Sequence, residues 1–250
     1  MQIDVMFLLV AYSGVLIAAV SKTGFGGGAS FVATPILALV IDPGLALGIM
    51  LPLLMLMDAT GLRAYWRQWS TRDAWRLCLG GLPGIAAAAA VFRLADPDVF
   101  RFLIGAISVG FVLFQWAGSR GWLRPRVRPL PPGAGYLAGA LAGFTSFVAH
   151  AGGPAALMYL LSQGLTKTAF QATTVIVFAI LNVTKAAIYA QLGFFSPDAL
   201  RLVALLAPAA LVGAILGVRA NRVIPEKAFF GLTYVLLLGA GAKLIWGAVV

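Results

Sequence analysis

Two glycine-rich stretches hold most of the residues whose types and spacing could bind a ligand. The first is Ser21-Lys22-Thr23-Gly24-Phe25-Gly26-Gly27-Gly28, and the second runs from Thr145 and Ser146 through His150 to Gly152-Gly153-Pro154. A glycine run lets the backbone approach a ligand, and a helix that begins after it presents free N–H groups and the positive end of its dipole. The pattern predicts two helix N-termini that together bind a small anion. Close helix packing through small residues is the alternative interpretation of these glycines.

Four ionisable residues within or beside apolar runs are candidates for a function in the membrane: Lys22, Asp58, His150 and Lys185. A charge at the centre of a membrane helix costs about 2.5–3.5 kcal/mol, so each group needs a partner or a function. Asp58 and Lys185 lie at similar depths in two apolar segments, which predicts an ion pair between them. Asn182 and Lys185, three residues apart, share a helix face and could instead offer an amide and an ammonium to substrate oxygens. Lys22 could neutralise an anion or extend to the membrane surface.

His150 is the only histidine, and an imidazole suits proton coupling or contact with an anion, although buried histidines are more often structural. One histidine and one cysteine, Cys78, cannot supply the ligand set of a metal site. No G-x-S-x-G motif is present, and the glycine run lacks the strand and acidic residue of a dinucleotide site. We therefore expect no metal, no cofactor and no enzymatic activity. Proton coupling through His150 or Asp58 stays open.

Composition places these residues in a membrane. Of 250 residues, 61% are hydrophobic and 10% are charged, and the mean hydropathy is +0.97. A soluble domain would carry roughly a quarter charged residues. The net charge of +10 indicates basic cytoplasmic loops rather than nucleic acid as a partner, so the expected partners are the lipid bilayer and a small anion, with an oligomer left open. The opening Met1-Gln2-Ile3-Asp4 is acidic, so we expect a retained span rather than a secretory signal.

At about 20 apolar residues per span, the chain divides into ten apolar segments. They cover approximately residues 3–20, 28–41, 44–65, 75–93, 98–117, 134–149, 153–163, 168–191, 199–218 and 227–249. Segments 28–41 and 153–163 are too short to cross a bilayer, and each follows a glycine-rich stretch, which predicts broken or re-entrant helices. The expected fold class is an all-α polytopic membrane protein.

Two groups of five segments flank an arginine- and proline-rich linker. A shift near 125 residues aligns Ser21 through Gly28 with Ser146 through Gly153, Asp58 with Asn182, Tyr65 with Tyr189, and Pro83 with Pro208. Matched polar and proline residues in one order favour duplication over coincidence. We therefore divide the chain into a first transmembrane repeat at 1–117, a cytoplasmic linker at 118–132 and a second transmembrane repeat at 133–250.

Basic residues predict how the two repeats are oriented. Lysine and arginine cluster at residues 63–76, 120–128 and 219–227, which should face the cytoplasm. The loop at 191–198 matches the basic loop at 66–73 but contains no lysine or arginine. Matching loops then face opposite sides, which is typical of inverted-topology repeats. Each half crosses an odd number of times, either three with a re-entrant hairpin or five, and both termini lie outside.

These features resemble the TauE/SafE family, also called the sulfite exporter or toluenesulfonate uptake permease group. The resemblance is carried by Gly24 through Gly28 with Pro35, by Ser146 through Pro154, and by the duplicated architecture around an arginine-rich centre. It implies a bacterial inner-membrane exporter of sulfite or organosulfonates, with both glycine-rich stretches facing the substrate. Ala151 stands where the first half has Gly26, so the two breaks need not bind alike.

The expected mechanism is alternating access. An anion would rest between the two broken helices, held by backbone N–H groups, Ser21, Thr23, Ser146 and a nearby cation, while rocking of the halves exposes it to either side. Two other functions remain open. One is a non-transport scaffold or intramembrane enzyme, whose glycines serve packing, and the other is an importer of another small solute.

Overall fold

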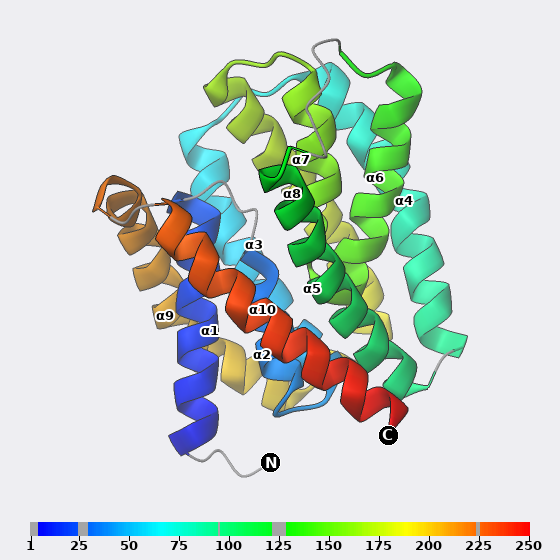
Figure 1. Cartoon of the computed structure of the whole chain (residues 1–250), viewed down its shortest axis with the longest axis vertical. Helices are drawn as coiled ribbons and strands as arrows, with labels where there is room; N and C mark the ends of the chain where they lie inside the picture. The colour runs from blue at the N-terminus through cyan, green and yellow to red at the C-terminus, as the bar shows by residue number, and fades with distance from the viewer. Residues whose placement is uncertain (1–4, 25–29, 95, 122–128, 224–225) are drawn as a thin grey trace.

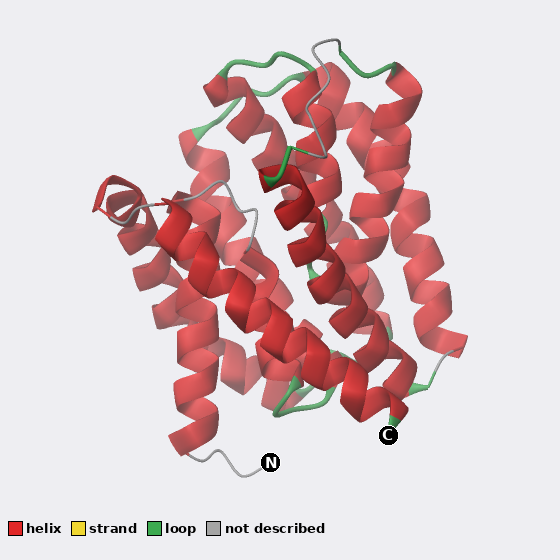
Figure 2. Ribbon diagram, viewed as in Figure 1, coloured by secondary structure: helices red, strands yellow, loops and turns green. Residues whose placement is uncertain are grey.

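The structure, a computed structural model, describes residues 5–24, 30–94, 96–121, 129–223 and 226–250, and all regular elements within them are helices (Figure 2). The first half contains α1 (Val5–Gly24), η1 (Ser30–Val32), α2 (Ala33–Ala38), α3 (Pro43–Ala64), α4 (Thr71–Leu94) and α5 (Pro97–Ser119). The second half contains α6 (Pro132–Ala149), α7 (Gly153–Ser162), α8 (Lys167–Gln191), α9 (Pro197–Val223) and α10 (Glu226–Val249). Each predicted apolar segment corresponds to one α-helix, so the all-α fold class is confirmed.

Both halves follow the same order of one long helix, one short helix and three long helices. The short members are α2, with 6 residues, and α7, with 10 residues. Within the described residues, seven helices are long and apolar enough to cross a bilayer: α1, α3, α4, α5, α8, α9 and α10. The short helices match the two segments that were too short to span. The chain is therefore a polytopic helical membrane protein whose second helix in each half is short.

Helices of one half pack mainly against helices of the other half. α1 lies along α9 and α6 lies along α4, while α3 contacts α8 and α5 contacts α10. The counterparts in the two halves are α1 and α6, α3 and α8, α4 and α9, and α5 and α10. If each helix is exchanged for its counterpart, the α1–α9 pair becomes the α6–α4 pair. The α3–α8 and α5–α10 pairs stay the same. In Figure 1, α1 begins at the lower end of the molecule and α6 begins at the upper end. Inverted repeats require this exchange and this reversal, although descent from one duplicated unit stays a prediction.

Glycines allow the α4 and α6 backbones to approach closely. A Cβ atom added at Gly80 or Gly84 would overlap a backbone carbonyl oxygen of α6, and one added at Gly143 would overlap that of Gly81. Small residues perform this role widely in membrane helix pairs, because the lipid supplies no hydrophobic force between helices. The close α4–α6 packing fixes the position of the C-terminal end of α6, where the helix break described below begins.

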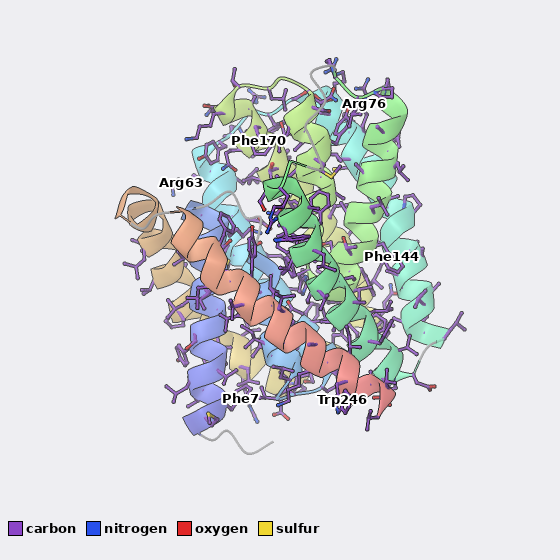
Figure 3. The ribbon with its side chains drawn as sticks, viewed as in Figure 1. Phe7, Arg63, Arg76, Phe144, Phe170 and Trp246 are labelled. Atoms are coloured by element: carbon purple, nitrogen blue, oxygen red, sulfur yellow. The ribbon has the colours of Figure 1, made fainter. Side chains whose placement is uncertain are left out.

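Two arginines beside the connection between α3 and α4 lie toward one end of the molecule. Arg63 and Arg76 lie toward the upper end, whereas Phe7 and Trp246 lie toward the lower end (Figure 3). α1 begins and α10 ends at the lower end (Figure 1). The basic segment between α3 and α4 is thus separated from the termini by the length of the helices, as the predicted orientation requires.

Candidate functional site

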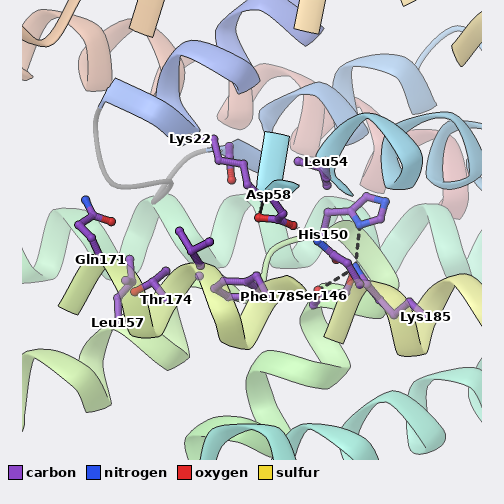
Figure 4. A pocket seen from close by; sticks show the side chains of 14 residues that line it. Lys22, Leu54, Asp58, Ser146, His150, Leu157, Gln171, Thr174, Phe178 and Lys185 are labelled. Carbon is purple, nitrogen blue, oxygen red and sulfur yellow. Dashed lines mark hydrogen bonds and ion pairs between the residues drawn. The ribbon is translucent and has the colours of Figure 1, made fainter. Parts of the chain in front are cut away.

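A small polar cavity lies between the two halves of the chain, beside the break between α6 and α7 (Figure 4). The first half lines it with Lys22 of α1, Ser30 of η1, and Leu54 and Asp58 of α3; the second half lines it with Ser146, His150, Gly153, Leu157, Gln171, Thr174, Val175, Phe178, Asn182 and Lys185. About 50 Å³ is open to the centre of a water-sized sphere. One water needs about 10–15 Å³ on this measure, so the cavity has room for only a few water-sized groups.

The break that opens onto this cavity is made at His150. α6 ends at Ala149, and His150 takes a left-handed conformation with φ of 56°. Its backbone N–H still donates to the carbonyl oxygen of Ser146. α7 then begins at Gly153, which lines the cavity, and no side chain caps it. Because the first N–H groups of a helix have no partners within it, the wall at Gly153 presents a free donor and the positive end of the α7 dipole.

Lys185 of α8 carries a fully buried amino group at the cavity wall. Its Nζ lies 3.0 Å from the carbonyl oxygen of Ser146, 2.9 Å from Ser146 Oγ and 2.9 Å from His150 Nδ1. The residue is 0% exposed, and none of the ion pairs among the described residues includes it. An ammonium has three hydrogen-bond donors. In its charged form Lys185 is therefore hydrogen-bonded by neutral groups, and no carboxylate contacts it.

The imidazole of His150 is held between two partners. Nε2 lies 3.3 Å from the carbonyl oxygen of Leu47, and Nδ1 faces Lys185. Since a carbonyl oxygen only accepts, the contact to Leu47 assigns the hydrogen to Nε2 and leaves Nδ1 as the acceptor for Lys185. The neutral tautomer with hydrogen on Nε2 satisfies both contacts.

Asp58 of α3 binds Lys22 in place of the expected partner Lys185. Its Oδ1 lies 2.7 Å from Lys22 Nζ, and its Oδ2 accepts from Asn182 Nδ2 at 2.6 Å. The predicted ion pair between Asp58 and Lys185 is wrong, because α1 brings Lys22 to the carboxylate while Lys185 turns to the end of α6. With both lysines protonated, two ammonium groups and one carboxylate line the cavity, and the sum of their formal charges is +1.

The structure brings seven of the residues singled out in the sequence to the cavity wall: Lys22, Asp58, Ser146, His150, Gly153, Asn182 and Lys185. Gly24 is the last residue of α1, and Gly26, Gly27 and Gly28 lie outside the described residues. The contribution of the first glycine run to the site therefore stays a prediction.

Four predicted site residues do not line the cavity. Thr23 donates to the carbonyl oxygens of Ala19 and Ala214 and so ties α1 to α9. Thr145 Oγ1 contacts the carbonyl oxygens of Leu141, Ala142 and Ala151 and supports the break. The hydroxyl of Ser21 is buried with no hydrogen-bond partner in the described part of the chain. A Cβ at Gly152 would lie 2.6 Å from the carbonyl oxygen of Ala142, so this glycine allows close packing behind the site.

Sequence reasoning missed most of the α8 face that forms one wall. The residues Gln171, Thr174, Phe178, Asn182 and Lys185 recur at intervals of three or four, so they share one side of the helix. Polar side chains at this spacing in an otherwise apolar span were a usable signal. Leu54 and Ser30 carried no such signal, because an isolated leucine or serine is ordinary in a membrane helix.

No group of three or more metal-ligating side chains occurs among the residues that the structure describes. The thiol of Cys78 is buried, and burial is consistent with a packing role for this residue. The cavity therefore presents donors and positive charge rather than the carboxylate, thiolate and imidazole clusters that hold cations.

Comparison with known proteins agrees with the membrane fold. A family profile described as sulfite exporter TauE/SafE matches residues 11–244, which is nearly the whole chain. No curated protein and no solved structure matches. The match includes both halves, the break at His150 and every residue that lines the cavity. The chain is therefore a multi-pass membrane protein that belongs to the sulfite exporter TauE/SafE family of transporters.

Proposed function

We propose that this protein exports a small anion, sulfite or a small organosulfonate, through alternating access of the cavity between its halves. The observation that carries the proposal is the excess of basic groups in the cavity. With Lys22 and Lys185 protonated and Asp58 ionised, the cavity holds one net positive charge in a membrane interior. A buried charge without a counter-charge is costly. A bound anion of one negative charge would neutralise it.

The groups around the cavity suit the oxygens of such an anion. The N-terminus of α7 offers a backbone N–H at Gly153, Ser146 offers a hydroxyl, and Lys185 offers an ammonium. Helix N-termini and ammonium groups together are typical of oxyanion sites. The open space of about 50 Å³ accommodates a compact sulfur oxyanion such as sulfite, while an organic tail requires the cavity to widen.

The position of the cavity between the halves supports alternating access. Wall residues come from α1 and α3 on one side and from α6, α7 and α8 on the other. Relative rocking of the halves would open the cavity to one membrane face at a time. The inside-negative potential favours the exit of net negative charge by about 2.3 kcal/mol per charge per 100 mV.

The proposed location is the bacterial inner membrane, with the basic ends in the cytoplasm and both termini outside. Arg63 and Arg76 lie toward the end opposite the termini (Figure 3), and the positive-inside tendency places such residues in the cytoplasm. Labelling of single cysteines placed after Val250 and beside Trp66 would test this orientation in whole cells. A membrane-impermeant thiol reagent should reach the first and not the second.

Flux in proteoliposomes tests the transport proposal. We expect sulfite and methanesulfonate to leave protein-containing vesicles faster than protein-free vesicles. A scaffold would produce no anion-dependent flux. An importer of an unrelated solute would leave both anions inside, so retention of both at every imposed potential would refute the proposal.

A further inference from the structure

We propose that His150 takes up a proton when an anion binds, so that this protein moves a proton together with its anion. The inference rests on the proposed function and adds a second bound species to the same site. It follows from the hydrogen bonds of Lys185 and His150 at the cavity wall.

The first step is the count of donors on Lys185. Its ammonium has three N–H groups, and the three contacts with Ser146 O, Ser146 Oγ and His150 Nδ1 use all of them. No donor of Lys185 is left for an incoming anion. The anion must therefore replace one of these three acceptors.

The second step identifies the acceptor that is replaced. The carbonyl oxygen of Ser146 can only accept, so its replacement gives the anion one new bond, from Lys185. Replacement of Ser146 Oγ gives the anion that bond and a second one from the uncharged serine hydroxyl. Nδ1 of His150 can bind a proton and become a donor. If the anion replaces Nδ1 as the acceptor of Lys185, the anion gains two charge-assisted bonds, one from Lys185 and one from the protonated His150. Such bonds are stronger than bonds between neutral groups. Exchange at His150 is therefore favoured.

The third step concerns charge. The groups that face His150 are Lys185 and Tyr189 of α8, Lys22 of α1 and Asp58 of α3. Without an anion, a proton on Nδ1 would point at the ammonium of Lys185 across 2.9 Å, and the cavity would carry two net positive charges. With a monoanion bound, the protonated site returns to +1, the charge of the empty site. Anion and proton therefore stabilise each other.

The proton comes from the buffered aqueous solution and binds the lone pair of Nδ1, while the hydrogen on Nε2 stays bonded to Nε2 and is donated to the carbonyl oxygen of Leu47. No covalent bond breaks in the protein. A monoanion with one proton carries no net charge, whereas a dianion with one proton carries one negative charge outward. The membrane potential then drives export of dianions and not of monoanions.

Calorimetry on the purified wild-type protein tests the inference without any variant. Methanesulfonate is the probe, because it keeps one charge through the range in which histidine titrates, roughly pH 5 to 8. Binding enthalpies in two buffers of different ionisation enthalpy should show an uptake approaching one proton per anion at the alkaline end of this range. The dissociation constant should rise there by up to about tenfold per pH unit. Binding of methanesulfonate without proton uptake would overturn the inference and leave the proposed function intact.

Variants assign the proton to a residue. The variant His150→Asn places asparagine, which tolerates positive φ, at this position. We expect it to abolish both proton uptake and the pH dependence of methanesulfonate binding, at whatever affinity it binds methanesulfonate. Asp58→Asn tests the carboxylate of the cavity. Proton uptake that survives in His150→Asn and disappears in Asp58→Asn would assign the proton to Asp58 and refute the inference. If the wild type binds neither methanesulfonate nor sulfite, the proposed function is refuted, and the inference about His150 is refuted with it.

Discussion

Replacing Lys185 with methionine should weaken anion binding while leaving the protein folded. Methionine keeps an unbranched apolar stem but has no ammonium group, so the cavity falls from one net positive charge to zero. Hydrogen bonds to charged groups contribute about 1.5–3 kcal/mol. At 1.4 kcal/mol per factor of ten, sulfite affinity should fall roughly 10- to 150-fold.

Ligand-dependent stabilisation provides the assay. At a sulfite concentration 100 times the wild-type dissociation constant, binding stabilises the wild type by about 2.7 kcal/mol. For affinities 10- to 150-fold weaker, the same concentration stabilises Lys185→Met by only about 1.4 to 0.3 kcal/mol. Thermal unfolding of detergent-solubilised protein with and without sulfite measures this difference within each variant. The stability lost with the Lys185 bonds to Ser146 and His150 is the same with and without sulfite, so it cancels from the difference between the two measurements.

The matched control is Lys243→Met, because Lys243 is an exposed lysine of α10 outside the cavity. It should keep the full sulfite stabilisation of the wild type. If Lys185→Met binds sulfite as tightly as Lys243→Met, the buried ammonium is structural, and our account of the anion site is wrong.

Three further predictions concern the charge of the cavity and the packing around it. Asp58→Asn raises the net charge of the cavity to +2, so its preference for dianions over monoanions in competition binding should increase at least severalfold. Gly84→Ala should destabilise the protein by about 1–3 kcal/mol in denaturant titration, because the added Cβ overlaps a carbonyl oxygen of α6, while Gly239→Ala, at an open position, should change stability by less than about 1 kcal/mol. Tyr159→Phe removes a hydrogen bond that joins α7 to the buried Asp73 and should cost about 1–3 kcal/mol; an unchanged unfolding midpoint would show that this bond does not hold α7.

Several features could be read from the sequence because they depend on local chemistry. Long apolar runs must become helices in a bilayer, since every backbone group needs an internal partner. The glycine-rich stretch before α7 predicted the short helix and the break at His150, and the structure places both there. Buried charge is rare in membrane spans, so Asp58 and Lys185 were identified as candidate site residues from their types alone.

The partners of those charges could not be read in the same way. The sequence placed Asp58 and Lys185 at similar depth, but depth does not specify which face of each helix meets which neighbour. α1 lies close enough to deliver Lys22 to Asp58, and Lys185 meets the end of α6 instead. The apolar wall residues Leu54 and Phe178 were missed because leucine and phenylalanine are common on every face of a membrane helix.

The sequence by itself therefore determined the class of protein, the order of long and short helices, and the residue types able to hold an anion. Only the tertiary structure decided that Lys22 neutralises Asp58 and that Lys185 stands beside Ser146 and His150 with no carboxylate in contact. The physical reason is that hydrophobicity and backbone breaks act over a few neighbouring residues. The net charge of a cavity instead depends on how helices far apart in the chain rotate and pack.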